Sequence, residues 1–274
     1  MSAEELASVD GTITPTAEAT VPLRDDGLYR GDGAFEVIRL YRGRPFALED
    51  HLDRLQRSAA AIELDFDRAA LEREIAALLA EAGEFDGQLR LIVTRGGRRI
   101  AATETIPEHA ETVRIATVTY SPTLILNGVK SLSYAANMQA TRLAQAQGAD
   151  EAVLVQPDGT VLEPPTSTVF WVSPQGGLRT PALDNGVLES ITRDRLIKAL
   201  DVAEGAWPVA DLRAANEAFL ASTTREIQAV AAIDGSELPE APGPRTREAI
   251  EGFAAALGRG LQQEAGTLQG GKAQ

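Results

Sequence analysis

The alternation of strand-like and helix-like segments is the feature that most constrains how this chain folds. Residues 33–41, GAFEVIRLY, alternate apolar and polar side chains, which predicts a strand with one buried face. After an RGRP turn, residues 46–64 place Leu52, Leu55 and Ala59 three and four positions apart, the spacing of one helix face. Strand and helix in this succession predict an α+β arrangement.

The same mixture of patterns continues along the rest of the chain. Gly148 follows a helical pattern as its expected C-terminal cap, and a Pro-Asp-Gly turn separates two short strand patterns within residues 150–163. The predicted fold class is therefore α+β or α/β. Further helices are predicted at 67–82, 133–148, from Ile191 and at 246–264, and further strands at 87–97, 111–122, 167–172 and on both sides of a turn within 217–235.

A connection marked by proline and glycine, SPTLILNGV, interrupts this pattern near the middle of the chain. A chain of 274 residues suits one large domain or two of ordinary size. We predict a small N-terminal α/β domain at 1–120, an interdomain linker at 121–130 and a larger C-terminal domain at 131–274.

The composition narrows the class of partner. The net charge of −14 argues against nucleic acid or an anionic membrane surface. With no cysteine and two histidines, disulfides, thiolate catalysis and a histidine-rich metal site are excluded. No apolar run approaches the roughly 20 residues of a membrane span, and MSAEELASVDG carries no targeting signal. We expect a cytoplasmic protein, whose acidity fits either salt adaptation or an ordinary acidic enzyme.

One lysine has no obvious structural explanation. The chain contains three lysines, of which Lys198 lies in an amphipathic run and Lys272 in a polar tail, whereas Lys130 lies in NGVKSLSYAANMQ. A surface lysine at a helix start is one interpretation of Lys130, although a cation is mildly unfavourable there. The other is a partly desolvated amine with a lowered pKa, suited to forming a Schiff base.

An acid and an anion site would complete such a centre. Glu163 ends an apolar strand, where a carboxylate is costly unless a cation or donor lies nearby. A pyridoxal phosphate enzyme needs a lysine together with an acid at the pyridine nitrogen. Phosphate is favoured at a helix N-terminus and by a bidentate arginine. Each feature also has an ordinary interpretation, as a strand end, a helix cap, a turn or a solvated arginine. The candidates for the anion site are Arg54, Ile191, Thr192, Thr223 and Thr224.

Together, these segments resemble the class IV, or fold-type IV, pyridoxal phosphate enzymes. The resemblance runs in order from about residue 20 to residue 235, through RGDGAFEVIRLYRGRPFALEDHLDRLQRSA, VKSLSYAANMQATRLAQAQGADEAVLVQPDGTVLE, GVLESITRDRLI and FLASTTREIQAVAAIDG. It implies two α/β domains with pyridoxal 5′-phosphate at their interface. It also implies a homodimer in which Arg30 faces the neighbouring site.

The resemblance assigns roles residue by residue. Lys130 matches the lysine that holds the cofactor as a Schiff base and then moves the proton of the substrate α-carbon. Glu163 matches the acid at the pyridine nitrogen, and Tyr134 the phenol at the ring oxygen. Leu188 matches the apolar residue packed against the ring. The phosphate cup is matched by Arg54, Ile191, Thr192, Thr224 and Thr223.

The chain departs from the family pattern where substrates are selected. Thr168, in PPTSTVF, occupies the position of a common asparagine, and a Thr-Ser-Thr version resembles some lyases of the family. Well-known D-amino-acid aminotransferases hold the substrate carboxylate with an Arg-x-His pair, whereas TRGGRRIAA has Arg98 and Arg99 but no histidine. Ser190 replaces a frequent glycine. Arg30, Phe35 and Arg98 are the candidate substrate contacts, with a surface role equally open for Arg98 and Arg99.

The resemblance implies a transaminase that moves an amino group between an amino acid and a 2-oxo acid. The RGDGAFEV and KSLSY segments favour D-amino acids or (R)-amines as donors. One alternative is a 4-amino-4-deoxychorismate lyase that eliminates pyruvate, and another is a branched-chain L-amino-acid aminotransferase. A third, of a different class, is a non-catalytic cofactor-binding or acidic interaction protein on the same scaffold.

Overall fold

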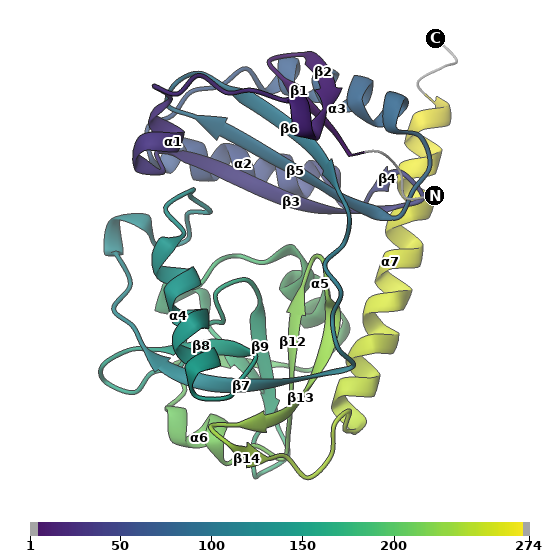
Figure 1. Ribbon diagram of the computed structural model, residues 1–274. Coiled ribbons are helices and arrows are strands. Elements are labelled where there is room, and N and C mark those ends of the chain that lie inside the picture. The colour runs from purple at the N-terminus through teal and green to yellow at the C-terminus, as the bar shows by residue number, and fades with distance from the viewer. Residues whose placement is uncertain (1–4, 271–274) are drawn as a thin grey trace. The chain divides into compact units, whose positions relative to one another are not determined.

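The chain forms two compact units in a computed structural model that describes the backbone of residues 5–270 and the side chains of residues 5–261 (Figure 1). Unit 1 contains the chain up to Pro107, Val129–Tyr134 and the end of the last helix, and unit 2 contains Glu108–Gly128 and Ala135–Gln262. The chain thus passes between the units more than once. The predicted linker, 121–130, includes the crossing at Val129.

Unit 1 is an antiparallel sheet with two helices packed on one face. The strand order is β2-β1-β6-β5-β3-β4, and each neighbouring pair is antiparallel. Its elements are β1 (Leu6–Val9), β2 (Thr12–Pro15), η1 (Thr16–Glu18), α1 (Asp26–Arg30), β3 (Gly33–Tyr41), β4 (Arg44–Pro45), α2 (Leu48–Ala61), α3 (Arg68–Ala82), β5 (Gly87–Thr94) and β6 (Arg99–Glu104).

The apolar faces of β3 and α2 pack together in the core of unit 1. Ile38 and Leu40 of β3 are fully buried, and Leu52 and Leu55 of α2 pack into the same cluster. Burial of this apolar surface is the main force that holds the two elements together. The predicted strand at 33–41 and the helices at 46–64 and 67–82 are therefore confirmed, whereas β1, β2 and β6 carry no pattern that we recognised.

Residues 129–134 join the sheet of unit 1 beside the beginning of β3. The amide of Phe35 donates to the carbonyl of Lys130 at 3.0 Å, and the amide of Leu132 donates to the carbonyl of Gly33 at 2.9 Å. A side chain at Gly33 would place its Cβ 2.7 Å from the Leu132 side chain, so glycine permits this close approach. The helix predicted at 133–148 begins at Ala135, and Lys130 therefore lies in an extended segment, not at a helix start.

Unit 2 is a mixed sheet of order β11-β10-β9-β12-β13-β7-β8, with β14 paired to β13. The β7–β8, β7–β13 and β10–β11 pairs are parallel. Its strands are β7 (Thr112–Thr119), β8 (Glu151–Val155), β9 (Thr168–Val172), β10 (Leu178–Pro181), β11 (Ala203–Gly205), β12 (Glu217–Ser222), β13 (Glu226–Ile233) and β14 (Ser236–Glu237). The helical segments are η2 (Leu124–Leu126), α4 (Ala135–Ala146), η3 (Leu183–Asn185), α5 (Ile191–Ala199), α6 (Val209–Arg213) and α7 (Pro244–Gly270).

The central strands of unit 2 are buried along their whole length. Every residue of β9 and β12 is buried, and Phe170 stacks on Phe219 with ring centroids 5.0 Å apart. The continuous apolar runs of the two strands therefore match a sheet covered on both faces. The second strand predicted within 150–163 is wrong as a regular strand, because Val161 makes only an isolated bridge to Val155.

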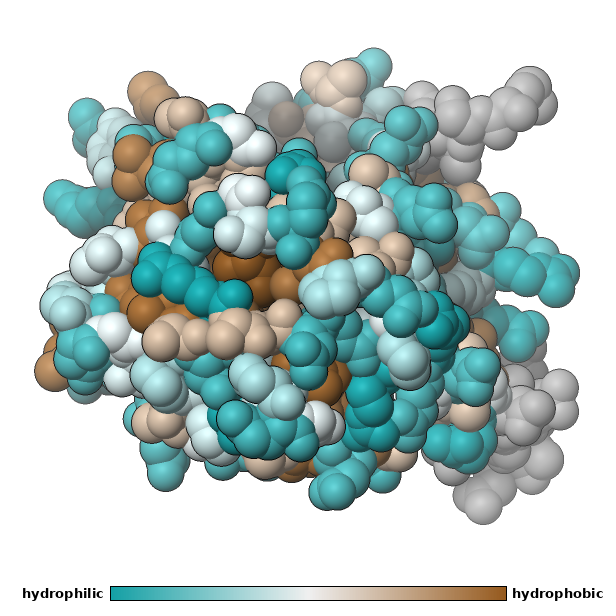
Figure 2. Space-filling model, turned by 90° about the horizontal axis from the view of Figure 1, so that it is seen from below, coloured by the Kyte–Doolittle hydropathy of each residue, from teal (hydrophilic) through white to brown (hydrophobic). Residues whose placement is uncertain are grey.

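The face of the molecule drawn in Figure 2 is mainly hydrophilic. Figure 2 shows teal hydrophilic side chains around brown apolar ones on the face seen from below, as the high content of acidic residues predicts. Across residues 5–270, no helix combines the length and the apolar character that a membrane span requires.

Candidate functional site

Lys130 lies against two aromatic rings in unit 1. Its Nζ is 4.3 Å from the ring centroid of Phe35 and 5.8 Å from that of Tyr134. The two rings meet edge to face with centroids 5.2 Å apart. The backbone amide of Lys130 donates to Ser58 Oγ of α2 at 3.1 Å, which fixes the segment from a second side. The structure thus brings together three of the predicted site residues: Lys130, Phe35 and Tyr134.

Arg54 is buried in the same unit and forms a fork with a carboxylate that we had not singled out. Its Nε donates to Glu36 Oε1 at 2.7 Å and its Nη2 donates to Glu36 Oε2 at 2.6 Å. Arg54 is 5% exposed and Glu36 fully buried, so the interpretation of Arg54 as a solvated arginine is wrong. A bidentate pair of this kind fixes the plane of the guanidinium.

His51 completes this buried cluster. Its Nδ1 lies 2.8 Å from Glu36 Oε2. Burial raises the pKa of Glu36, but the charge and hydrogen bonds of Arg54, with the hydrogen bond from His51, outweigh it and lower the pKa to about 2. Burial lowers the pKa of His51 below 6.5, against the raising effect of Glu36. His51 is therefore neutral at pH 7 and donates to Glu36 through Nδ1–H.

Two sequence signals could have revealed this cluster. Glu36 lies two positions from both Ala34 and Ile38 in β3. Because side chains two positions apart share one face of a strand, its carboxylate lies on the same face as these apolar residues. His51, Arg54 and Ser58 are three and four positions apart, which places them on one face of α2. A charged residue in the apolar register of one element, matched by a polar stripe on its neighbour, indicates a buried polar cluster.

Glu163 and Leu188 are brought together in unit 2. Glu163 Oε1 accepts a hydrogen bond from the backbone amide of Leu188 at 2.8 Å. The segment before Glu163 is held by the amide of Leu162, which donates to the carbonyl of Leu154 in β8 at 2.9 Å. The half-buried carboxylate is thus fixed by a backbone donor.

The N-terminus of α5 presents Ile191 and Thr192, which are both buried. Ser190 caps this helix, and its side chain accepts a hydrogen bond from the amide of Arg193 at 3.3 Å. The first amides of a helix favour an anion. Ser190 is therefore a sound replacement for glycine at this position, since serine is a preferred N-cap residue.

Thr223 and Thr224 are half-buried in the turn between β12 and β13. The next residue, Arg225, forms a buried ion pair with Glu151 of β8. This pair attaches the residue that follows the two threonines to β8 of the same unit.

The side chain at the usual asparagine position is also buried. Thr168 is 2% exposed, and its hydroxyl has no hydrogen-bond partner among the described residues. Its neighbours differ, because the hydroxyls of Thr166 and Ser167 reach Glu151 Oε1 at 3.3 and 3.4 Å. Within residues 5–261, Thr168 is therefore a buried hydroxyl without a hydrogen-bond partner, next to two hydroxyls that have one.

Arg98 and Arg99 are engaged in ion pairs of unit 1. Arg98 Nη1 donates to Asp10 Oδ2 at 2.6 Å, and Arg99 Nη2 lies 2.8 Å from Glu74 Oε1. Both side chains are partly exposed, so each pair contributes little to stability. Arg98 and Arg99 are thus both paired with acidic side chains of unit 1.

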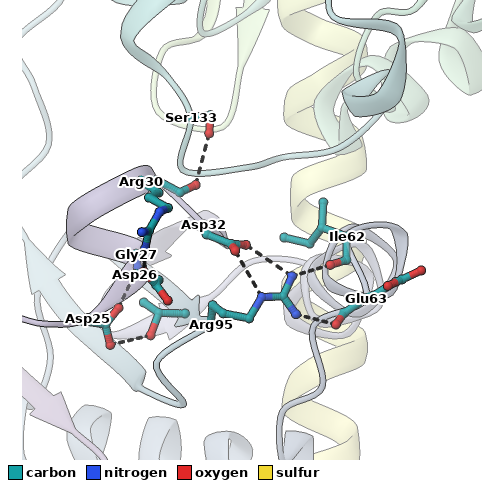
Figure 3. A network of polar contacts seen from close by, with 11 residues as sticks. Asp25, Asp26, Gly27, Arg30, Asp32, Ile62, Glu63, Arg95 and Ser133 are labelled. Carbon is teal, nitrogen blue, oxygen red and sulfur yellow. Dashed lines mark hydrogen bonds and ion pairs between the residues drawn. The ribbon is translucent and has the colours of Figure 1, made fainter.

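Arg30 ends α1 and is largely exposed, with an ion pair to Asp26 within the helix. Figure 3 shows Arg30 near Ser133. The hydroxyl of Ser133 donates to the carbonyl of Gly31, the residue after Arg30, at 3.2 Å. In the same view, Arg95 binds Asp32 and two carbonyls at the end of α2. The loop that follows Arg30 is thus attached to unit 1 at several points.

Each unit holds polar groups whose chemistry suits a part of pyridoxal phosphate. That cofactor presents an aldehyde, a ring nitrogen and a phosphate, which call for an amine, an acid and an anion site. Unit 1 supplies the amine of Lys130 and the guanidinium of Arg54. Unit 2 supplies the carboxylate of Glu163, the N-terminus of α5 and the hydroxyls of the 223–224 turn. The buried hydroxyl of Thr168, which has no hydrogen-bond partner among the side chains that the structure describes, is a further polar group of the kind that a ligand satisfies.

Comparisons with known proteins agree with this chemistry. A family model described as amino-transferase class IV matches residues 33–233. The chain is 32% identical to a D-alanine aminotransferase of Bacillus licheniformis, over 87% of this chain and 92% of the relative. It is 34% identical to a putative branched-chain-amino-acid aminotransferase of Methanocaldococcus jannaschii, over 83% and 87%. It is 31% identical to a bifunctional aminodeoxychorismate lyase and D-amino acid transaminase of Mycobacterium tuberculosis, over 86% and 94%.

A solved structure gives the same result for the fold. A hypothetical aminotransferase from Mycobacterium tuberculosis in a PLP-bound form superposes with a TM-score of 0.83 at 27% identity, covering 92% of this chain and 98% of that one. The α+β, fold-type IV prediction is therefore confirmed. With a family model that matches most of its length and relatives aligned almost end to end, this chain belongs to the class IV aminotransferases.

Proposed function

We propose that the protein is a pyridoxal phosphate-dependent transaminase that takes D-amino acids or (R)-amines as donors and 2-oxo acids as acceptors. Family membership establishes the aminotransferase class, and class IV aminotransferases use this cofactor. The observation that carries the assignment to this site is the position of Lys130. Its amine lies over Phe35 and Tyr134, and hydrogen bonds to β3 and α2 hold its backbone.

By the resemblance to class IV enzymes, each unit would contribute residues that bind the cofactor. Lys130 would hold it covalently, and Tyr134 would bind its ring oxygen. Glu163 would pair with the ring nitrogen while the Leu188 amide keeps its carboxylate oriented. Leu188 would pack against the ring. Arg54, the first amides of α5 and the 223–224 turn would bind the phosphate.

The bound cofactor supplies a ring that accepts the negative charge formed at the substrate α-carbon. The chain's own part is to move protons and hold groups in place. Lys130 Nζ would act as a general base that takes the proton from the substrate α-carbon. It would then act as a general acid that returns a proton to the cofactor. The Phe35 ring, whose centroid lies 4.3 Å from Nζ, covers one side of this amine.

The donor class rests on the relatives and on the sequence. A relative that aligns over most of both chains is named a D-alanine aminotransferase, which supports D-amino acids as donors. Arg30, Arg98 and Arg99 are the candidates for the donor carboxylate, and Arg30 would act on the site of a second copy in a homodimer. The homodimer, and a cytoplasmic location, remain predictions.

A half-reaction screen tests this proposal. The purified protein, loaded with pyridoxal phosphate, is mixed with D-alanine, L-alanine, L-leucine or an (R)-amine, and the cofactor absorbance is followed. With D-alanine, a D-specific transaminase loses the absorbance of the pyridoxal form of the cofactor. It regains this absorbance with a 2-oxo acid. The same change with L-leucine alone would establish the branched-chain alternative instead. No change with any donor would contradict a transaminase and would leave the lyase and the non-catalytic alternative.

A lyase that releases pyruvate from 4-amino-4-deoxychorismate is the second candidate. The Thr166–Thr168 sequence supports it, as does the relative whose name joins lyase and D-amino acid transaminase activities. The two activities differ in a single turnover. A lyase releases one pyruvate and retains the carbonyl form of the cofactor, whereas a transaminase leaves the aminated form.

A further inference from the structure

The core of unit 1 contains a carboxylate, a guanidinium and an imidazole where the surrounding cluster is apolar. Glu36, His51 and Arg54 are 0%, 1% and 5% exposed. They lie beside Ile38 and Leu52, which are also completely buried. Burying charged groups in such a core costs free energy even when they are paired. Stability by itself therefore does not account for the charged groups of this cluster.

The geometry of the cluster fixes the orientation of Arg54. Both oxygens of Glu36 accept from Arg54, through Nε at 2.7 Å and Nη2 at 2.6 Å. Since the guanidinium is planar and rigid, a fork on its Nε–Nη2 edge directs the Nη1 end away from the carboxylate. An unsupported arginine, by contrast, keeps several rotamers and loses entropy when it binds a ligand.

His51 fixes the carboxylate in its turn. Its Nδ1–H donates to Glu36 Oε2 at 2.8 Å, the oxygen that also accepts from Arg54 Nη2. His51 and Arg54 project from the same face of α2, while Glu36 comes from β3. The carboxylate is thus held by two residues of one helix, and its negative charge is balanced within the cluster by the charge of Arg54.

We propose that Glu36, supported by His51, is the positioning residue that orients Arg54 for the phosphate of the cofactor. This inference rests on the proposed function, because it takes Arg54 as a phosphate ligand. Glu36 touches neither the phosphate nor the reacting atoms. Its effect is confined to ligands that carry a phosphate, which separates positioning from a general role in folding.

The experiment compares pyridoxal phosphate with pyridoxal, which lacks the phosphate. Equilibrium affinities are measured spectroscopically for the cofactor-free forms of the wild type, Glu36→Gln, Arg54→Lys and the double variant. We expect Glu36→Gln to weaken pyridoxal phosphate binding by about tenfold or more, the effect of a lost charge-assisted hydrogen bond, and to leave pyridoxal within about twofold. In the Arg54→Lys background, Glu36→Gln should change neither affinity by more than about twofold, because lysine cannot form the fork.

Glu104→Gln is the matched control, because Glu104 also forms a fork with an arginine, Arg90, in unit 1 and has no proposed cofactor contact. It should leave both affinities unchanged. If Glu36→Gln does not fold, Glu36→Asp takes its place, since it keeps the charge but withdraws it from Arg54. Equal losses for both ligands, or no loss for either, would overturn the positioning role. Failure of the wild type to bind pyridoxal phosphate would overturn the proposed function itself.

Discussion

The candidate residues of unit 1 and those of unit 2 are held in place by different kinds of interaction. In unit 1, Arg54 is oriented by ion pairing with Glu36 inside an apolar core. In unit 2, Glu163 is oriented by the amide of Leu188, and the start of α5 by its Ser190 cap. Breaking a buried charged pair costs more stability than removing one hydrogen bond from a backbone donor. Substitution of the Glu36–Arg54 pair in unit 1 should therefore lower stability more than substitution of Glu163 or Ser190 in unit 2.

The largest effect is expected for Lys130→Ala, which separates chemistry from stability within unit 1. Removing the proton-transfer group should lower the rate of amino transfer by about a thousandfold or more. The melting temperature should change little, because Lys130 is only half-buried and contributes its backbone to the sheet. Lys198→Ala, on the exposed side of α5, is the control and should keep full activity. Retained activity in Lys130→Ala would contradict the proposed mechanism.

The next largest effect is expected on the stability of Glu36→Gln. The pKa of Glu36 falls from an ordinary 4.5 to about 2 on folding, a difference on the order of 3 kcal/mol. A lowered pKa stabilises the fold fully above pH 4.5, and this stabilisation is lost as the pH falls toward 2. Urea unfolding should show the wild type more stable than Glu36→Gln at pH 7, with the gap narrowing below pH 4.5. A gap that is independent of pH would show that Glu36 is not the titrating group.

Glu163→Gln should show the opposite balance. The glutamine oxygen can still accept from the Leu188 amide, so we expect a change in unfolding free energy below about 1 kcal/mol. Loss of the negative charge at the ring nitrogen should lower the transamination rate by about ten- to a hundredfold. A destabilisation as large as that of Glu36→Gln would abolish the distinction between the units.

The smallest effect is expected for Ser190→Ala, which removes the cap of α5. The loss should be about 1 kcal/mol of stability, with a modest decrease in affinity for pyridoxal phosphate. Ser190→Asp keeps a capping oxygen but adds a negative charge, so it should restore stability while weakening phosphate binding. Thermal unfolding and cofactor titration of both variants measure the two effects separately.

The elements of the site were predictable because they depend on local patterns. The alternation in β3 and the helical spacing of Leu52, Leu55 and Ala59 are properties of short segments, and both elements formed as expected. The partners of Arg54 were not recognised, because Glu36 is 18 residues away and only the pairing of β3 with α2 brings the two together. The extended course of the Lys130 segment likewise depends on contacts with β3 that no local pattern encodes.

The most direct test of the central claim is the identity of the lysine that holds the cofactor. The protein is loaded with pyridoxal phosphate, reduced with borohydride and digested, and the labelled peptide is identified by mass spectrometry. With only three lysines in the chain, the result is unambiguous. The proposed site predicts that the label lies on Lys130 and disappears in Lys130→Ala. Label on Lys198 or Lys272, or none at all, would contradict it.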